Sequence, residues 1–89
     1  MIFKIKTKED LEKVAEMART YATIEWPYWQ WEIEVLDDRH IKIKCTIEEN
    51  SCEFDEDFIG TYDWYQLADR IRAKCQWTQA CASGTLEMY

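Results

Sequence analysis

The side chains most often used in hydrolytic catalysis are few in this chain and lie far apart in the sequence. His40 is the only histidine, and Ser51 and Ser83 are the only serines. Nucleophilic catalysis needs a serine or cysteine beside a base that a third group orients, and the sequence suggests no such set. We therefore predict no catalytic residue and expect that the protein is not an enzyme.

Carboxylates are abundant enough to supply an acid–base pair of the glycosidase type. Such a pair needs a deep cleft, which a chain of 89 residues seldom encloses. Glu56 is the one acid on a predicted apolar face, which makes it the first candidate for such a role. We interpret Glu56 first as a residue at a β-bulge or at a wet sheet edge, and rank an enzyme last among the functions considered.

One segment partly matches a calcium loop. Residues 55–66 agree with the EF-hand pattern at positions 1, 3, 6 and 9, but Ile59 stands where an oxygen ligand is needed and Gln66 replaces the final glutamate. Both departures fall on ligands, so we interpret the match as accidental. The sequence predicts no metal site and no cofactor.

The cysteines are Cys45, Cys52, Cys75 and Cys81. Their spacing lacks the paired Cys-x-x-Cys motifs of a zinc site. The chain is rich in apolar residues, and its first residues lack the features of a secretory leader. We therefore expect all four cysteines to be reduced, acting as small buried hydrophobic residues rather than forming disulfides.

Negative charge is concentrated in the middle of the chain. The window Glu25–Asp63 holds twelve acids and three bases, a balance of −9, whereas the remaining residues sum to +2. A negative field repels nucleic acid and membranes and attracts basic surfaces. The expected partner is therefore a basic protein surface, with no direct contact to nucleic acid or membrane. No apolar run approaches the ~18 residues of a membrane span, and we expect a cytoplasmic protein.

Hydrophobic periodicity predicts the elements that must position these charges. We expect one α+β domain over residues 1–89, of order β-α-β-β-β-α, with an antiparallel sheet and two helices packed on one face. The predicted elements are a strand at 2–6, a helix with a capping box at 7–10 that Pro27 ends near residue 25, strands at 29–35, 41–47 and 52–58, and a helix capped by Thr61 or Asp63 that ends near Gly84. Residues 85–89 fit a short strand or a docked tail.

The parity of the apolar positions restricts the strand registers. Between the first two strands of the meander the predicted pairs are 35 with 41 and 33 with 43. Between the second and third strands paired numbers must sum to an odd value, for example 47 with 52 and 45 with 54. These registers place Lys42 between Glu34 and Asp57, and Lys44 between Glu32 and Asp55.

The face left uncovered by the helices is the predicted binding site. Its proposed partner-binding residues are Glu32, Glu34, Glu53, Asp55 and Asp57 on the strands, Glu48 and Glu49 in a loop at 48–51, and the aromatic pair Trp26 and Tyr28 beside Pro27. Side chains on one strand face repeat every ~6.6–6.8 Å, giving a row of carboxylates that a nucleic-acid groove could accept. The alternatives are a solvated face kept for solubility and aromatic residues packed under the first helix.

Our leading hypothesis is a small acidic inhibitor encoded by a phage or mobile element. It would occupy the basic nucleic-acid groove of a host nuclease or CRISPR effector as a partial DNA mimic. In size and charge the chain resembles anti-CRISPR and related DNA-mimic inhibitors, although no motif carries that resemblance. The second hypothesis is a non-enzymatic module that binds a basic peptide or protein, or forms a homodimer through its aromatic end.

Overall fold

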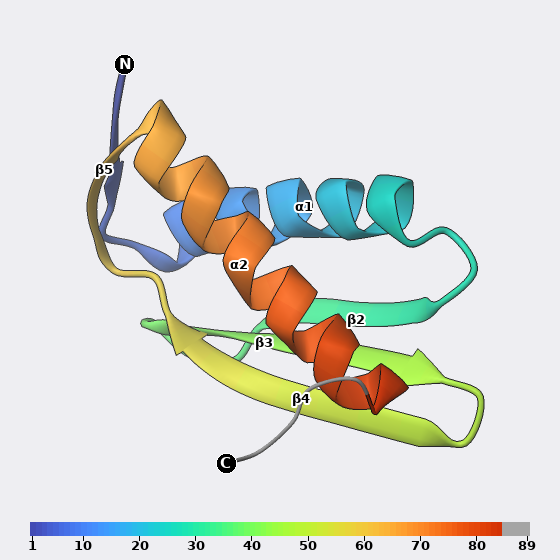
Figure 1. The fold of residues 1–89 in the computed structure, drawn as a ribbon. Coiled ribbons are helices and arrows are strands. Elements are labelled where there is room, and N and C mark those ends of the chain that lie inside the picture. The colour runs from blue at the N-terminus through green and yellow to red at the C-terminus, as the bar shows by residue number, and fades with distance from the viewer. Residues whose placement is uncertain (85–89) are drawn as a thin grey trace, which may run out of the picture.

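The computed structural model describes residues 1–84, which form an α+β domain as predicted. Its elements are β1 (Ile2–Ile5), α1 (Lys8–Glu25), β2 (Gln30–Val35), β3 (His40–Ile47), β4 (Asn50–Asp57), β5 (Gly60–Asp63) and α2 (Trp64–Ser83). Strands β2, β3 and β4 form an antiparallel sheet in that order, and β1 pairs separately with β5. Both helices lie on one face of the three-stranded sheet (Figure 1). The prediction for residues 85–89 falls outside the described part of the chain.

Both helices begin at capping boxes. Thr7 Oγ1 accepts a hydrogen bond from the Asp10 amide at 3.2 Å, and the Asp10 carboxylate accepts one from the Thr7 amide at 3.0 Å. At α2 the cap is Asp63, and Gln66 completes the reciprocal pair. These bonds satisfy amides that the first turn of a helix leaves without intrahelical partners. The predicted cap of α1 is thus confirmed, and of the two candidates for α2 Asp63 is the cap.

Both helices also end at the positions that Pro27 and Gly84 predict. Helix α1 ends at Glu25, two residues before Pro27, because a residue that precedes proline is disfavoured in helical conformation. Helix α2 ends at Ser83, and Gly84 follows with φ of 76°, a left-handed conformation that glycine adopts without steric cost. Both predicted boundaries are confirmed.

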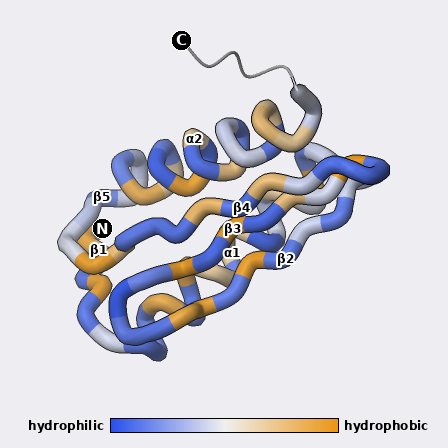
Figure 2. Tube along the Cα trace, turned by 90° about the horizontal axis from the view of Figure 1, so that it is seen from below, coloured by the Kyte–Doolittle hydropathy of each residue, from blue (hydrophilic) through white to orange (hydrophobic). Residues whose placement is uncertain are grey.

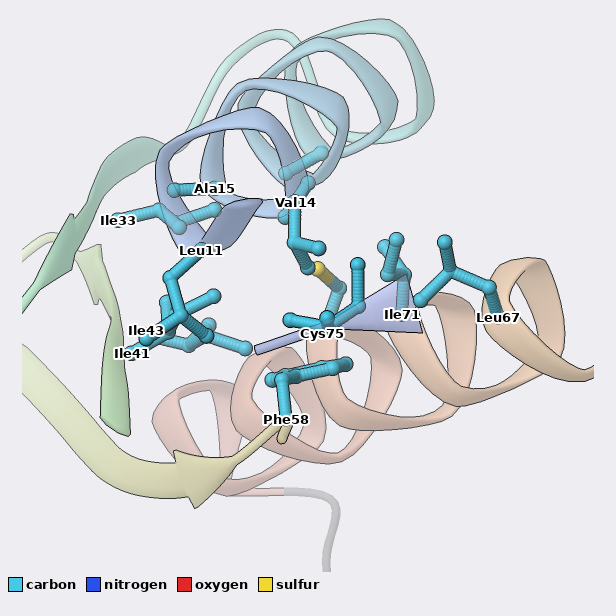
Figure 3. Close-up of a cluster of buried hydrophobic side chains, with 13 residues drawn as sticks. Leu11, Val14, Ala15, Ile33, Ile41, Ile43, Phe58, Leu67, Ile71 and Cys75 are labelled. Atoms are coloured by element: carbon cyan, nitrogen blue, oxygen red, sulfur yellow. The ribbon is translucent and has the colours of Figure 1, made fainter. Parts of the chain in front are cut away.

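The hydrophobic core lies between the sheet and the two helices (Figure 3). Its members come from every layer and are Ile5, Leu11, Val14, Ala15, Ala18, Ala22, Ile33, Ile41, Ile43, Phe58, Leu67, Ile71 and Cys75. The predicted stripes of both helices supply most of these residues. Helical spacing also predicts Tyr21, Trp64 and Ala68 as members of these stripes, but the three do not reach the core: Tyr21 and Ala68 are half-buried, and Trp64 is 48% exposed.

The register of β2 and β3 is the predicted one, with Val35 opposite Ile41 and Ile33 opposite Ile43. The odd parity between β3 and β4 is also confirmed, but both example pairs are wrong by two residues. Cys45 lies opposite Cys52, because a tight turn at 48–49 replaces the predicted loop at 48–51. Glu48 adopts φ of 57° in this turn, a conformation uncommon for glutamate and therefore hard to predict.

Strand β5 was not predicted. The last predicted strand ends at residue 58, whereas residues 60–63 also form a strand and pair with β1, with Ile2 opposite Asp63. Four residues are too few to show an alternating pattern, and the partner strand lies at the other end of the sequence. The prediction therefore had the right fold class with one strand too few.

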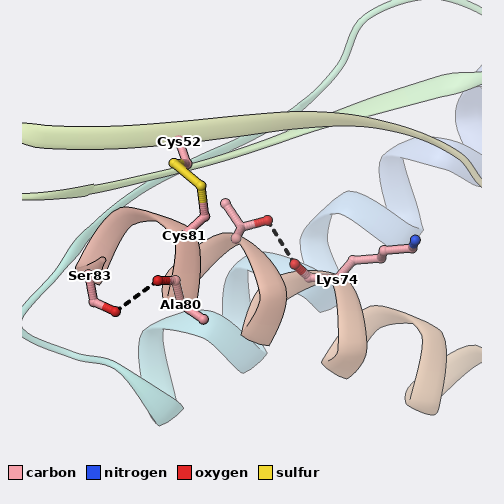
Figure 4. Close-up of a disulfide and its surroundings, with 6 residues drawn as sticks. Cys52, Lys74, Ala80, Cys81 and Ser83 are labelled. Atoms are coloured by element: carbon pink, nitrogen blue, oxygen red, sulfur yellow. Dashed lines mark hydrogen bonds between the residues drawn. A yellow bond between two sulfur atoms is a disulfide. The ribbon is translucent and has the colours of Figure 1, made fainter. Parts of the chain in front are cut away.

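The cysteine prediction is wrong for two of the four residues. A disulfide joins Cys52 on β4 to Cys81 on α2, with 6.0 Å between their Cα atoms (Figure 4). Cys45 and Cys75 are free and buried, as expected. Sequence spacing could not reveal the disulfide, because packing of α2 on β4 brings together residues 29 positions apart.

Candidate protein-binding face

The surface of β2, β3 and β4 that points away from the helices is called the open face below. Its strand residues are Gln30, Glu32 and Glu34 on β2, His40, Lys42, Lys44 and Thr46 on β3, and Ser51, Glu53, Asp55 and Asp57 on β4. Figure 2 is seen from this side: the strands lie in front of α1, α2 runs next to β4, and hydrophilic positions alternate with hydrophobic ones along the strands. The predicted uncovered face therefore exists.

Two lysines of β3 run down the centre of the open face, between acids of both outer strands. Lys44 lies between Glu32 and Glu53 in the register, and its Nζ is 3.5 Å from Glu32 Oε2. The predicted neighbour on β4 was Asp55, and the shift of two residues in the β3–β4 register corrects it to Glu53. Across the open face, the charged side chains are therefore negative on β2, positive on β3 and negative on β4.

Lys42 makes the tighter of the two central ion pairs. It lies between Glu34 and Asp55, and not Asp57 as predicted, because of the same register shift. Its Nζ is 2.8 Å from Glu34 Oε1, and this hydrogen bond lowers the pKa of Glu34 and raises that of Lys42. Both lysines therefore contact carboxylates of β2.

The carboxylates of Glu53 and Asp55 are exposed on the outer strand β4. Within residues 1–84, no salt bridge involves either of them. They are consecutive members of one strand face, so their side chains lie ~6.6–6.8 Å apart. These two acids are the part of the predicted row that remains available to a partner.

Asp57, the third predicted member of that row, is engaged within the molecule. Its Oδ2 accepts hydrogen bonds from Arg39 Nη2 at 2.8 Å and Nε at 3.2 Å, and its Oδ1 accepts one from the Ile59 amide at 2.9 Å. The Arg39 guanidinium, followed by the Ile59 amide, holds the pKa of Asp57 below its ordinary value. Asp57 is therefore neutralised and oriented by Arg39, and not by Lys42 as the predicted register implied; its role in partner binding stays a prediction.

The predicted loop acids lie at the end of the β3–β4 hairpin. Glu48 and Glu49 form its turn and are exposed. With them and Arg39 included, the open face and its rim carry seven carboxylates and three bases. The surface remains negative despite the internal ion pairs.

Glu56 lies on the helix-covered side of β4 and is not part of the open face. Its side chain is 15% exposed, and its Oε2 is 3.2 Å from Lys74 Nζ on α2. The strand continues through Glu56 without a bulge, opposite Ile41. Of the two predicted explanations, the bulge is wrong. The sheet edge is correct, with a lysine in place of water as the main partner.

The predicted aromatic pair divides into one packed and one exposed residue. Trp26 is half-buried, with ring centroids of Tyr21, Trp29 and Trp31 at 5.9, 6.3 and 5.6 Å. Tyr28 is 95% exposed. Trp26 is therefore packed against other aromatic rings beside the first helix, as in the alternative interpretation. Of the two residues, Tyr28 is the one with an exposed ring.

An apolar groove lies between the two helices and was not predicted from the sequence. It has a volume of about 390 Å³ and is lined mainly by Met17, Tyr21, Trp64 and Ile71. The groove exists because Tyr21 and Trp64, assigned to the core from periodicity, lie at its margin instead. It is on the opposite side of the molecule from the open face.

The described residues contain no cluster of three or more His, Cys, Asp or Glu side chains that could hold a metal ion. In the segment resembling a calcium loop, Asp55 lies on a strand and Asp57 binds Arg39. Neither α1 nor α2 has an apolar stretch long enough to span a lipid bilayer. No protein-family model, curated protein or solved structure matches this chain.

Proposed function

We propose that this protein is a small, non-enzymatic inhibitor that binds a basic protein surface through its open face. The partner we infer is a nucleic-acid-binding protein, whose groove the acids of β4 enter as a partial DNA mimic. The exposed, unpaired carboxylates of Glu53 and Asp55 are the observation that carries this proposal. They stand where a partner's lysines and arginines can reach them without breaking an existing ion pair.

The proposal extends to a biological setting. A protein of this size and charge suits a phage or mobile element that inhibits a host nuclease or CRISPR effector in the cytoplasm. Such a target has a channel lined with Lys and Arg for phosphates, and regularly spaced carboxylates satisfy the same groups. Lys42 and Lys44 are paired with the acids of β2, so Glu53 and Asp55 of β4 remain without an ion pair in the described residues.

A second candidate function is a module that binds a basic peptide or protein unrelated to nucleic acid, or that forms a homodimer. The observation in its favour is Tyr28, whose exposed ring lies next to the packed Trp26 cluster. A bare aromatic ring can hold a guanidinium or ammonium group by cation–π attraction. Binding of this kind would depend on Tyr28 and only weakly on salt.

The test compares two variants that remove the same charge. Glu53→Gln with Asp55→Asn neutralises the free acids of β4, and Glu12→Gln with Glu25→Gln neutralises two exposed acids of α1, on the helix-covered side. Asp57 is left intact because its bonds to Arg39 and Ile59 support the fold. Immobilised wild-type protein first captures targets from a bacterial lysate, which mass spectrometry identifies. Affinities of the purified target are then measured at several salt concentrations.

We expect the β4 variant to lose about tenfold or more in affinity at low salt, and the α1 variant to bind like wild type. Affinity of the wild type should fall steeply as salt rises, and duplex DNA should displace it from the target. Equal binding by both variants, together with salt-insensitive binding that DNA does not displace, would refute the proposal. Loss of that binding in Tyr28→Ala would then favour the second function.

A further inference from the structure

Three contacts of different chemistry join β4 to α2. Cys52 is bonded to Cys81, the Phe54 and Trp77 rings stack with centroids 5.4 Å apart, and Glu56 is 3.2 Å from Lys74. Alternate residues of a strand point to one face, and residues three or four apart in a helix share a side. The disulfide is therefore the last contact of a continuous interface, at the C-terminal end of α2.

The two remaining cysteines lie in the same layer but in a different environment. Cys45 is directly opposite Cys52 in the β3–β4 register, where Cα atoms are about 4.5–5.5 Å apart. Cys45 and Cys75 are each 0% exposed, whereas Cys52 and Cys81 are half-buried. Only the bonded pair is open to a reagent from solvent.

Burial also makes the free pair chemically inert. It raises the pKa of the Cys45 thiol to about 11 and that of Cys75 to about 12. Thiolate is the species that attacks a disulfide, so neither thiol carries enough of it at neutral pH to exchange with the neighbouring bond. The Cys52–Cys81 bond is thus protected from rearrangement despite its closeness to Cys45.

We propose that Cys52–Cys81 is a reversible redox latch that fastens the last turn of α2 to β4, with Cys45 and Cys75 excluded from exchange. The inference rests on the four cysteines and is independent of the proposed binding partner. It also reconciles a disulfide with a reducing cytoplasm, because the latch would be open there and would close under oxidising conditions.

Opening the latch requires two thiols, and closing it requires a disulfide. The thiolate of one reduced glutathione attacks one sulfur of the latch, forms a mixed disulfide and releases the other cysteine as a thiolate. The thiolate of a second glutathione attacks the glutathione sulfur of the mixed disulfide and releases the remaining cysteine, so the latch gains two electrons and two protons while the two glutathiones become oxidised glutathione. In the reverse direction, Cys52 or Cys81 attacks oxidised glutathione, and the other cysteine then displaces the second glutathione as a thiol.

Opening the latch should leave the rest of the domain folded. Helix α2 buries Leu67, Ile71 and Thr78 upstream of Cys81, and its N-terminal cap is at the far end. Among residues 79–84, Ala82 is the one buried side chain. Reduction is therefore expected to release the final turn of α2 and not the sheet.

The experiment equilibrates wild-type protein with oxidised or reduced glutathione and alkylates free thiols after denaturation. Peptide mass spectrometry should find Cys45 and Cys75 alkylated in the oxidised sample, and all four cysteines in the reduced one. The thermal midpoint should be higher by about 10 °C or more in the oxidised protein, because the bond closes a long loop in the unfolded chain. Amide hydrogen exchange should speed up on reduction in residues 79–84 and remain slow in β3.

Two variants separate the latch from the other cysteines. Cys52→Ser with Cys81→Ser should show the same midpoint under both conditions, whereas Cys45→Ala should be less stable yet retain the redox-dependent shift. Four free thiols in the wild type after treatment with oxidised glutathione would overturn the proposal, as would a disulfide that includes Cys45 or Cys75. Equal wild-type midpoints in the two states would overturn it too, and this measurement needs no variant.

Discussion

A single arginine connects three parts of the structure at the boundary between the two sheets. Arg70 of α2 donates a hydrogen bond from Nη1 to the Tyr62 hydroxyl at 2.8 Å and another from Nη2 to the Asp57 carbonyl. Its guanidinium carbon lies 5.0 Å from the centroid of the Phe58 ring. These contacts fix the segment in which the chain leaves β4 and enters β5.

We predict that Arg70→Lys lowers the free energy of unfolding by about 1–3 kcal/mol. An ammonium group cannot reproduce the planar guanidinium that contacts a hydroxyl, a carbonyl and a ring together, so one partly buried acceptor would lose its donor. Urea denaturation monitored by tryptophan fluorescence measures the loss. Arg72→Lys is the control, because Arg72 pairs with Asp69 at the surface and its replacement should change stability by less than about 0.5 kcal/mol. Equal effects of the two substitutions would contradict the role given to Arg70.

Sequence reasoning assigned no role to Arg70, and it did not reveal the pairing of Asp57 with Arg39, for the same physical reason. Periodicity gives the face on which a side chain lies, but not the partner that a long, flexible side chain finds there. Arg70 flanks the apolar stripe of α2, and Arg39 lies in a turn, so neither stands out in the pattern. The existence of the open face was predictable, whereas the distribution of its ion pairs was not.

Helix α2 begins at an N-cap residue that is also the last residue of β5. Asp63 is the last residue of β5 and its carboxylate accepts the Gln66 amide at 2.8 Å, while Gln66 Oε1 accepts the Asp63 amide at 2.9 Å. One residue therefore ends the strand and starts the helix. Its side chain satisfies an amide that the helix itself cannot.

Asp63→Ala should destabilise the protein by about 1 kcal/mol, the usual cost of removing such a cap. Chemical denaturation gives the value, and far-ultraviolet circular dichroism should show an intact fold. Gln76→Ala, at an exposed position of the same helix, should be neutral within about 0.5 kcal/mol. A cap variant as stable as this control would show that the first turn of α2 is held by packing alone.

Elements with a repeating apolar pattern could be predicted, and those defined by one unusual residue or one distant contact could not. Alternation gave β2 and β3 with their register, and helical spacing gave α1 and α2. The β3–β4 register depends on the positive φ of Glu48, for which the sequence provides no signal. Strand β5 depends on pairing with β1, and the disulfide depends on how α2 crosses β4.

In residues 1–84 the strands form a three-stranded sheet and a short two-stranded ribbon, and α2 contacts both. Strand β3 has a hydrogen-bonded strand on each side, whereas within these residues β1 and β5 pair with one another alone. The β1 side chains also include Ile2, which is 61% exposed. The ribbon therefore has less buried contact to oppose local opening than the central strand.

We predict that amides in the middle of β3 exchange with solvent only through global unfolding, and that amides of β1 and β5 exchange at least about tenfold faster. Hydrogen exchange followed by nuclear magnetic resonance on the oxidised protein tests this order. Similar protection in the ribbon and in β3 would mean that the two sheets open as one unit.

The pairing of β1 with β5 has a consequence for how the chain is made. Ile2 lies opposite Asp63, so the first strand leaves the ribosome long before its partner does. At translation rates of roughly 5–20 residues per second, β1 waits about 3–12 s with its backbone groups unpaired. Lys4 and Lys6, which alternate with the apolar residues there, supply the positive charge that discourages newly made chains from aggregating along this strand.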